Sequence, residues 1–440
     1  MSAPGRRSYR VAPVAHVGGS LTVPGDKSIS HRALLLGALS EGQTRITGFL
    51  ESEDCHATLG ALRALGVHIE QPAANQVLVT GVGMHGLHPS DQPLDMGNAG
   101  TAMRLFMGLL CGQKFSSRLI GDASLMRRPM ERVAKPLRLM GARIDTQADR
   151  PPVVLHGDAD LHAIDYSLPM ASAQVKSAIL LAALQARGTT RVTEPAPTRD
   201  HTERMLAAFG ATSTRRGATV ELPGGQRLRG TDIRVPGDFS SAAFFVVAGC
   251  LAAAEGLTVR RVGVNPTRTG LLTMLRLMGA QITVTPRDDA GPEPMADISV
   301  HAGALRGATI PPELVPLAID ELPILFIAAA CATGETLVTG AAELRVKESD
   351  RLAVMAAGLT ALGVRCELLP DGIRIQGGTL HGGRVDSHGD HRVAMAFAIA
   401  SVRATRPIEI GDVANVATSF PGFPEAARQV GVALDEVAGP

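Results

Sequence analysis

The sequence predicts an α/β protein of two similar domains, each made of three repeats that place a buried helix against sheets. Three observations predict this class. An amphipathic stretch followed by a glycine and an apolar alternation occurs six times along the chain. Six almost wholly apolar stretches, each opened by a few polar residues, alternate with it. The tetrapeptide Val-Pro-Gly-Asp occurs at 23–26 and again at 235–238.

The repeated glycine marks the end of a helix in each repeat. Glycine adopts the left-handed conformation that closes many helices. The residues after it alternate between apolar and polar with the period of a strand. The prediction is therefore a helix, a glycine and a strand, in that order. The six positions are Gly66, Gly141, Gly210, Gly279, Gly363 and Gly431.

The apolar stretches are predicted to be interior helices, because a helix that is apolar on every side belongs in the core of a domain. Several are followed by a turn and a β-branched run typical of a strand, as at 44–47, 189–193 and 335–339. The polar openings are Lys27-Ser28, Asn98-Ala99-Gly100-Thr101, Ser172-Ala173-Gln174, Ser240-Ser241, Asp320-Glu321 and Asp390-His391.

The duplicated tetrapeptide indicates where the chain crosses between the domains. Because its first copy comes only after residue 22, we expect the N-terminal strand to belong with the C-terminal half. The predicted domain 1 is therefore discontinuous, with residues 1–24 and 237–440, and domain 2 holds residues 25–236. We expect a hinge near 22–26 and 235–239.

Composition excludes several classes of protein. The 440 residues include 43 basic and 42 acidic side chains and only 3% aromatics, which is unlike a nucleic-acid-binding surface. The N-terminus shows no secretory signal, and the apolar run 241–254 is shorter than the ~20 residues that span a bilayer. The five cysteines form no CxxC pair. We expect a cytoplasmic protein with no membrane contact, disulfide or structural metal.

The starts of the interior helices are predicted to bind anions. A helix start has N–H groups without intrahelical partners and carries about half a positive charge. If the helices of a domain run parallel, these ends meet at one face, and two facing domains then form a cleft for anions. Eight cations of this nearly neutral chain lie at or beside the openings: Lys27, Arg32, Arg104, Arg128, Arg199, Lys347, Arg351 and Arg392.

Acid–base candidates lie among these cations. The pair Asp320-Glu321 precedes the apolar run 322–330, and Glu348 lies between Lys347 and Arg351. Carboxylates and a lysine in a desolvated, charge-crowded site are suited to proton transfer. Each residue alone has a structural alternative: a helix cap for Asp320 and a solvated surface charge for each cation. The sequence has no HExxH, Walker or GxSxG element, so metalloprotease, nucleoside triphosphatase and serine hydrolase are not supported.

Five segments of the chain carry the motifs of one known family: 24–32 (PGDKSISHR), 97–104 (GNAGTAMR), 128–130 (RPM), 345–351 (RVKESDR) and 390–392 (DHR). Together they resemble the 5-enolpyruvylshikimate-3-phosphate synthases, and the resemblance extends over essentially the whole chain. It implies an inside-out α/β barrel of six βαβαββ repeats. It also implies transfer of the enolpyruvyl group of phosphoenolpyruvate to the 5-hydroxyl of shikimate 3-phosphate, through a tetrahedral intermediate, in aromatic amino-acid biosynthesis.

The same resemblance implies the roles of individual residues, and it implies no metal or organic cofactor. Asp320 would accept the proton of the 5-hydroxyl. Glu348 with Lys27 would transfer the proton that the methylene carbon gains and later loses. The residues implied for shikimate 3-phosphate are Lys27, Ser28, Arg32, Ser172, Ala173, Gln174, Arg199, Asp320 and Lys347. Those implied for phosphoenolpyruvate are Lys27, Asn98, Gly100, Arg128, Gln174, Arg351 and Arg392.

Two positions, Ala173 and Thr418, differ from the enterobacterial pattern, which has serine and lysine there, and resemble the second sequence class of the family. Tolerant members of that class can have alanine at the position of Gly100, so we expect glyphosate to inhibit this chain. We also expect a monomer. The alternative is a UDP-N-acetylglucosamine 1-carboxyvinyltransferase, whose reactive cysteine would lie in the loop 113–128, where this chain has none. A non-catalytic anion-binding protein would not need Asp320 or Glu348.

Overall fold

The computed structural model describes residues 7–288 and 291–438, and these residues divide into two compact units. Unit 1 contains the residues up to Pro24, those from Pro236 to 288 and those from Pro294 onward. Unit 2 contains Gly25 to Val235 together with 291–293. Two short pieces therefore lie outside the domains expected for them: Pro236 belongs to unit 1, and 291–293 belong to unit 2. The second difference arises because Glu293 is buried against His201 of unit 2.

All six expected interior helices are present, and each begins at or within two residues of its polar opening, which confirms this prediction. Nearly every residue in them is buried. In unit 2 they are α1 (Lys27–Leu39), α3 (Gly100–Leu110) and α5 (Ala173–Ala183). In unit 1 they are α7 (Phe239–Ala252), α9 (Leu322–Ala330) and α11 (His391–Ala400).

A second set of helices ends at the repeated glycines. Each of the six glycines has a φ between 85° and 100°, the left-handed conformation that the sequence predicted. A strand begins within four residues of each glycine. These helices are α2 (Glu53–Ala64), α4 (Glu131–Leu139), α6 (His201–Ala208), α8 (Gly270–Leu277), α10 (Arg351–Ala361) and α12 (Phe423–Gln429). Short 3-10 helices are η1 (Leu125–Arg127), η2 (Pro312–Leu317), η3 (Ala342–Val346), η4 (Ser401–Arg403) and η5 (Ala414–Thr418).

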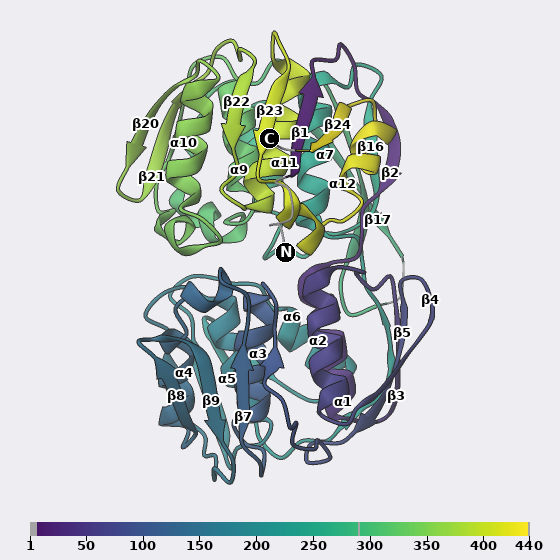
Figure 1. Cartoon of the computed structure of the whole chain (residues 1–440), viewed down its shortest axis with the longest axis vertical. Helices are drawn as coiled ribbons and strands as arrows, with labels where there is room; N and C mark the ends of the chain where they lie inside the picture. The colour runs from purple at the N-terminus through teal and green to yellow at the C-terminus, as the bar shows by residue number, and fades with distance from the viewer. Residues whose placement is uncertain (1–6, 289–290, 439–440) are drawn as a thin grey trace. The chain divides into compact units, whose positions relative to one another are not determined.

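The described part of unit 2 forms three sheets around its interior helices; Figure 1 shows β3, β4 and β5 beside α1 and α2. The strands are β3 (Ser40–Thr47), β4 (His68–Ala73), β5 (Gln76–Val82), β6 (Leu94–Asp95), β7 (Ser117–Ile120), β8 (Arg143–Gln147), β9 (Arg150–His156), β10 (Asp165–Ser167), β11 (Thr189–Thr193), β12 (Thr214–Arg216), β13 (Thr219–Pro223), β14 (Leu228–Arg229) and β15 (Asp232–Arg234). Their orders are β14-β3-β5-β4 with β15 also on β3, β6-β7-β9-β8 and β10-β11-β13-β12.

The described part of unit 1 also forms three sheets. The strands are β1 (Arg7–Ala12), β2 (Gly19–Thr22), β16 (Leu257–Gly263), β17 (Gln281–Arg287), β18 (Met295–His301), β19 (Glu335–Val338), β20 (Arg365–Leu369), β21 (Gly372–Gln376), β22 (Gly383–Asp386), β23 (Ile408–Gly411) and β24 (Ala433–Ala438). Their orders are β22-β23-β1-β24, β17-β18-β16-β2 and β19-β21-β20.

The N-terminal strands complete two of the unit 1 sheets. Strand β1 lies between β23 and β24 and is antiparallel to both, with Tyr9 opposite Ile410 and Glu436. Strand β2 runs parallel to β16. In the repeat that contains α9, isolated parallel bridges to Thr333 and Leu337 take the place of a first strand. Each unit therefore has helices inside and sheets outside, an inside-out α/β arrangement. In the part of the chain that the structure describes, no helix is long and apolar enough to cross a membrane.

Candidate active site

The starts of the three interior helices of unit 2 lie together. Arg32 near the start of α1 donates to Ser177 of α5 at 2.8 Å. Gln174 in the first turn of α5 accepts from Arg104 of α3 at 2.5 Å and donates to Thr101 of α3 at 2.9 Å. These contacts confirm, within this unit, that the N-terminal ends of the buried helices meet.

Arg32 is a buried cation with only neutral partners. Its Nε donates to the Thr202 hydroxyl at 2.7 Å, and its two other nitrogens donate to the Ser28 carbonyl and the Ser177 hydroxyl. Among the described residues no carboxylate lies within ion-pair distance of Arg32. A guanidinium has five N–H donors, so two are left by these contacts. Burial lowers the pKa of Arg32 to about 10, and the nearby charge of Arg199 acts in the same direction. The site can therefore stabilise an added anion.

Two further arginines, Arg104 and Arg128, lie near the start of α3. Arg128 is buried and donates to Asn98 at 2.6 Å, and Asn98 in turn donates to Asp122 at 2.7 Å. A Cβ on Gly100 would lie 2.8 Å from Nη1 of Arg128 and 3.4 Å from Nη1 of Arg104. The absence of a side chain at Gly100 therefore leaves room for both guanidinium groups.

Lys27, the first residue of α1, forms an ion pair that the sequence did not reveal. Its Nζ lies 2.9 Å from Oδ2 of Asp54 in α2, and both side chains are largely buried. The N-cap of α1 is Asp26, whose side chain accepts from the Ile29 N–H at 3.0 Å. No local pattern connects Lys27 with a carboxylate 27 residues later, so only the packing of α1 against α2 identifies Asp54.

The remaining unit 2 candidates also lie at helix starts. Ser172 is the N-cap of α5 and accepts from the Val175 N–H at 3.4 Å, and Ala173 is the first residue of that helix. Arg199 lies two residues before α6, which contributes Thr202 to the surroundings of Arg32. The unit 2 residues assigned to shikimate 3-phosphate thus gather at the starts of α1, α5 and α6.

In unit 1, one buried arginine holds three carboxylates. Arg351 is 1% exposed; its guanidinium lies 2.8 Å from Asp390, 2.6 Å from Glu348 and 3.3 Å from Asp320. Burial lowers the pKa of this guanidinium, but Asp390, Glu348 and Asp320 together outweigh burial and raise it. Arg351 therefore stays charged and connects the starts of α10 and α11 with Asp320, two residues before α9.

Asp320 is the point at which the unit 1 candidates meet. Its Oδ1 lies 3.6 Å from Nζ of Lys347 and 3.3 Å from Nη1 of Arg351, and its Oδ2 lies 3.9 Å from Arg392. Arg392 also donates to the Asp320 carbonyl at 3.1 Å. The structure thus brings together all five unit 1 candidates, including Glu348.

The start of α7 adds residues that the sequence did not assign to the site. Glu321 is buried, accepts from the hydroxyl of Ser240, and lies 3.6 Å from Arg268 and 3.8 Å from Arg392. Arg268 also donates to Ser240 at 2.6 Å. The sequence placed Glu321 beside Asp320 among the acid–base candidates but gave it no role, and it marked Ser240 only as a helix opening. Arg268 lies outside every motif, in the loop before α8. This network attaches the start of α7 to the site.

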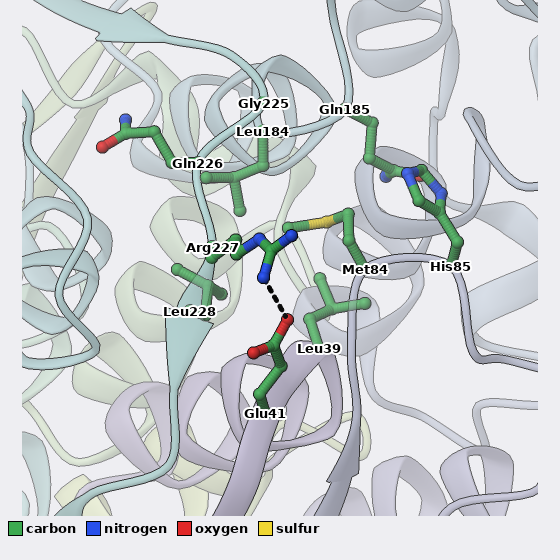
Figure 2. A pocket seen from close by; sticks show the side chains of 10 residues that line it. All are labelled: Leu39, Glu41, Met84, His85, Leu184, Gln185, Gly225, Gln226, Arg227 and Leu228. Atoms are coloured by element: carbon green, nitrogen blue, oxygen red, sulfur yellow. Dashed lines mark ion pairs between the residues drawn. The ribbon is translucent and has the colours of Figure 1, made fainter.

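Two pockets in the described part of the chain lie away from these residues. A pocket of about 280 Å³ in unit 2 is lined by Leu39 and Leu184, at the C-terminal ends of α1 and α5, and by an Arg227–Glu41 ion pair of 3.7 Å (Figure 2). A pocket of about 420 Å³ in unit 1 is lined by Leu251 of α7, among other residues. Neither of these two pockets is lined by a candidate site residue.

His31 makes the stability of unit 2 depend on pH. It is fully buried on α1, and burial, followed by the charges of Lys27 and Arg32, lowers its pKa from 6.5 to about 3. The unfolded chain takes up a proton on this residue below its ordinary pKa and the folded chain does not. His31 therefore does not reduce the free energy of unfolding above about pH 6.5, and reduces it increasingly as the pH falls from there towards 3. We expect His31 to lower the free energy of unfolding by about 2 kcal/mol between about pH 7.5 and about pH 5.

Urea unfolding of the wild type and of His31→Gln at these two pH values measures this contribution. The variant should lose less stability on acidification than the wild type. His85→Gln, at an exposed histidine of the same unit, serves as the control and should behave as the wild type. Equal losses in all three proteins would contradict the assignment to His31.

This site has clustered arginines, lysines and carboxylates at buried helix starts. Such a site is typical of enzymes that bind small polyanionic substrates and transfer protons between side chains and substrate. A sequence profile of the EPSP synthase (3-phosphoshikimate 1-carboxyvinyltransferase) family matches residues 11–426. The chain belongs to the EPSP synthase family.

Relatives and solved structures agree with this assignment. A protein of Alkalilimnicola ehrlichii named 3-phosphoshikimate 1-carboxyvinyltransferase is 60% identical over 428 residues, 97% of this chain and 96% of that protein. The structure of EPSP synthase from Acinetobacter baumannii is 52% identical with a TM-score of 0.88, covering 98% of this chain and 100% of that one. The enolpyruvyl transferase NikO from Streptomyces tendae shares the fold, with a TM-score of 0.81 at 18% identity over 99% of this chain and 100% of that one.

Cys111, the cysteine nearest the loop 113–128, is a poor nucleophile. It is fully buried at the end of α3, and its thiol donates to the Gly108 carbonyl at 3.4 Å. Burial raises the pKa of this thiol to about 12, which leaves almost no thiolate at neutral pH. This argues, together with the family match, against the UDP-N-acetylglucosamine alternative.

Proposed function

We propose that this chain transfers the enolpyruvyl group of phosphoenolpyruvate to the 5-hydroxyl of shikimate 3-phosphate and releases inorganic phosphate. The observation that carries the proposal is the gathering of cations and carboxylates at buried helix starts in a member of this family. Each substrate brings a carboxylate and a phosphate of about −1.5 to −2 charge, so the pair needs several cations. The reaction belongs to the shikimate pathway, which leads to the aromatic amino acids.

We assign the binding of shikimate 3-phosphate mainly to unit 2. Arg32 has donors to spare for an anionic group, and the hydroxyl of Ser172 and the amide of Gln174 lie at the neighbouring helix start. The full set is Lys27, Ser28, Arg32, Ser172, Ala173, Gln174 and Arg199, with Asp320 and Lys347 of unit 1.

Phosphoenolpyruvate carries its charge on a carboxylate and a phosphate, and bidentate arginines suit both groups. The absence of a side chain at Gly100 leaves room for the guanidinium of Arg128, which supports this role for Arg128. Arg351 and Arg392 have the corresponding role in unit 1. The full set is Lys27, Asn98, Gly100, Arg128, Gln174, Arg351 and Arg392.

The chemistry takes two balanced steps. In the addition, Asp320 accepts the proton of the 5-hydroxyl as its oxygen bonds to C2 of phosphoenolpyruvate, while Glu348 with Lys27 delivers a proton to the methylene carbon. In the elimination, the bond between C2 and the phosphate oxygen breaks, and Glu348 with Lys27 takes back a proton from the same carbon, which restores the double bond. Phosphate leaves with the electron pair of the broken bond, and the proton held by Asp320 passes to it or to water. The ion pairs of Arg351 with Asp320 and Glu348 keep both carboxylates in place. No step requires a metal or an organic cofactor.

We further propose a cytoplasmic monomer whose partners are its two small substrates, with no nucleic-acid or membrane partner. The segments 22–26 and 235–239, where the chain passes between the units, are the proposed hinge.

Phosphate release from the two substrates tests the proposal. The purified protein should release phosphate only when phosphoenolpyruvate and shikimate 3-phosphate are both present. Reactions that lack one substrate are the controls, and a reaction with UDP-N-acetylglucosamine as acceptor tests the alternative. Release with UDP-N-acetylglucosamine but not with shikimate 3-phosphate would overturn the proposal.

Gly100→Ala should weaken inhibition by glyphosate more than it weakens binding of phosphoenolpyruvate. The added methyl would lie 2.8 Å from Nη1 of Arg128, so this guanidinium must move and the space beside it shrinks. Glyphosate is longer than phosphoenolpyruvate and tolerates the loss of space less well. We expect the inhibition constant to rise at least about tenfold more than the KM, a difference of about 1.4 kcal/mol. Steady-state inhibition of both proteins measures this, and equal sensitivity of the two would refute it.

A further inference from the structure

Two hydroxyl groups hold the guanidinium of Arg32 from one side. Thr202 of α6 accepts from Nε at 2.7 Å, and Ser177 of α5 accepts from Nη2 at 2.8 Å. The Thr202 hydroxyl donates to the Ser177 oxygen at 2.8 Å, so the three groups form a closed triangle. All three residues are buried. A guanidinium is planar, so contacts to Nε and to one terminal nitrogen fix the orientation of the whole group.

Ion pairs at neighbouring positions hold the two hydroxyls at this separation. Lys176, next to Ser177, is fully buried and lies 2.7 Å from Glu203, next to Thr202. It also lies 3.1 Å from Glu194. On the other side of Thr202, Nδ1 of His201 lies 2.6 Å from the buried Glu293. The side chains of three successive residues, His201, Thr202 and Glu203, thus attach the first turn of α6 to its neighbours.

The partners of Arg32 are neutral, although carboxylates are close by. Glu203 and Glu293 both act on the pKa of Arg32. Glu203 lies 2.7 Å from Lys176 and 3.8 Å from Arg215, and Glu293 lies 2.6 Å from His201. A carboxylate in place of either hydroxyl would neutralise Arg32 and compete with an anionic ligand. Hydroxyls orient the guanidinium and leave its charge available.

We propose that Ser177 and Thr202 are positioning residues that orient Arg32 towards the anionic group of shikimate 3-phosphate. The inference rests on the proposed function of the site. Neither hydroxyl need touch the substrate, because each acts through Arg32.

Thr202→Val and Ser177→Ala test the proposal. Each variant should weaken binding of shikimate 3-phosphate roughly tenfold, because each removes a hydrogen bond to a charged group. Calorimetric titration with shikimate 3-phosphate measures this, and steady-state kinetics should show its KM raised while kcat and the KM of phosphoenolpyruvate stay near wild type. Thr202→Ser keeps the hydroxyl and should restore wild-type affinity.

Thr190→Val is the matched control. Thr190 is a fully buried threonine of β11 in the same unit, and within the described residues its hydroxyl has no hydrogen-bond partner. This variant should bind shikimate 3-phosphate as the wild type does. Wild-type affinity in both Thr202→Val and Ser177→Ala, or an equal loss in Thr190→Val, would overturn the inference. If the wild type itself does not bind shikimate 3-phosphate, the proposed function fails instead.

Discussion

Asp320→Asn is expected to lower kcat about a thousandfold while binding of shikimate 3-phosphate stays within a few-fold of wild type. General-base catalysis by a positioned side chain typically contributes a factor of 10² to 10⁴, and an amide cannot accept the hydroxyl proton. The asparagine keeps the size of the side chain and an oxygen that faces Arg351 and Lys347, which lie 3.3 and 3.6 Å from Oδ1. The local structure should therefore persist.

Phosphate release measures kcat, and calorimetric titration measures the affinity for shikimate 3-phosphate. Asp435→Asn, at an exposed aspartate of β24 in the same unit, is the control and should be fully active. If Asp320→Asn keeps a tenth or more of the wild-type kcat, Asp320 is not the base. If it loses both binding and turnover, its role lies in holding the cations instead.

Arg351→Met should cost about 3–5 kcal/mol of the free energy of unfolding of unit 1, and it should abolish activity. The guanidinium is buried and lies between Asp390, which is fully buried, and the side chains of Glu348 and Asp320. Its removal leaves carboxylates without a counter-charge in the interior, which is among the most destabilising of single changes. Activity falls as well because both proposed proton-transfer groups lose the contact that holds them.

Chemical unfolding with circular dichroism measures the loss of stability. Arg374→Met is the matched control: this arginine also contacts two carboxylates, Glu335 and Glu367, but it lies at the surface, so its removal should have little effect. Arg351→Lys should restore part of the stability, because an ammonium keeps the charge without the fork geometry. Equal stability of Arg351→Met and Arg374→Met would show that the buried cluster does not depend on Arg351.

Much of the architecture could be predicted because it depends on local patterns. A glycine after an amphipathic stretch predicts a left-handed residue at the end of a helix, and all six such glycines adopt this conformation. An all-apolar helix can be stable only in an interior, so α7 and α9 could be placed in the core from composition alone. Polar openings also mark where these helices begin, which is why Lys27 and Asp320 could be named in advance. Arg128 and Glu348 lie outside these openings and were named from the segments 128–130 and 345–351.

The contacts that turn those residues into a site could not be predicted from the sequence. Arg32 meets Thr202 across 170 residues, and Ser240 meets Glu321 across 81. Asp54 and Arg268 belong to no motif, and their roles follow only from the packing of α2 and the loop before α8.

The physical reason is that secondary structure depends on local sequence, whereas the contacts of a side chain depend on how distant segments pack. Helix starts, left-handed glycines and strand periods are properties of a few consecutive residues, and the sequence alone determined them. Which side chain faces a buried charge depends on how distant segments pack. The tertiary structure therefore decided that Arg32 has only neutral partners while Arg351 shares its charge with three carboxylates.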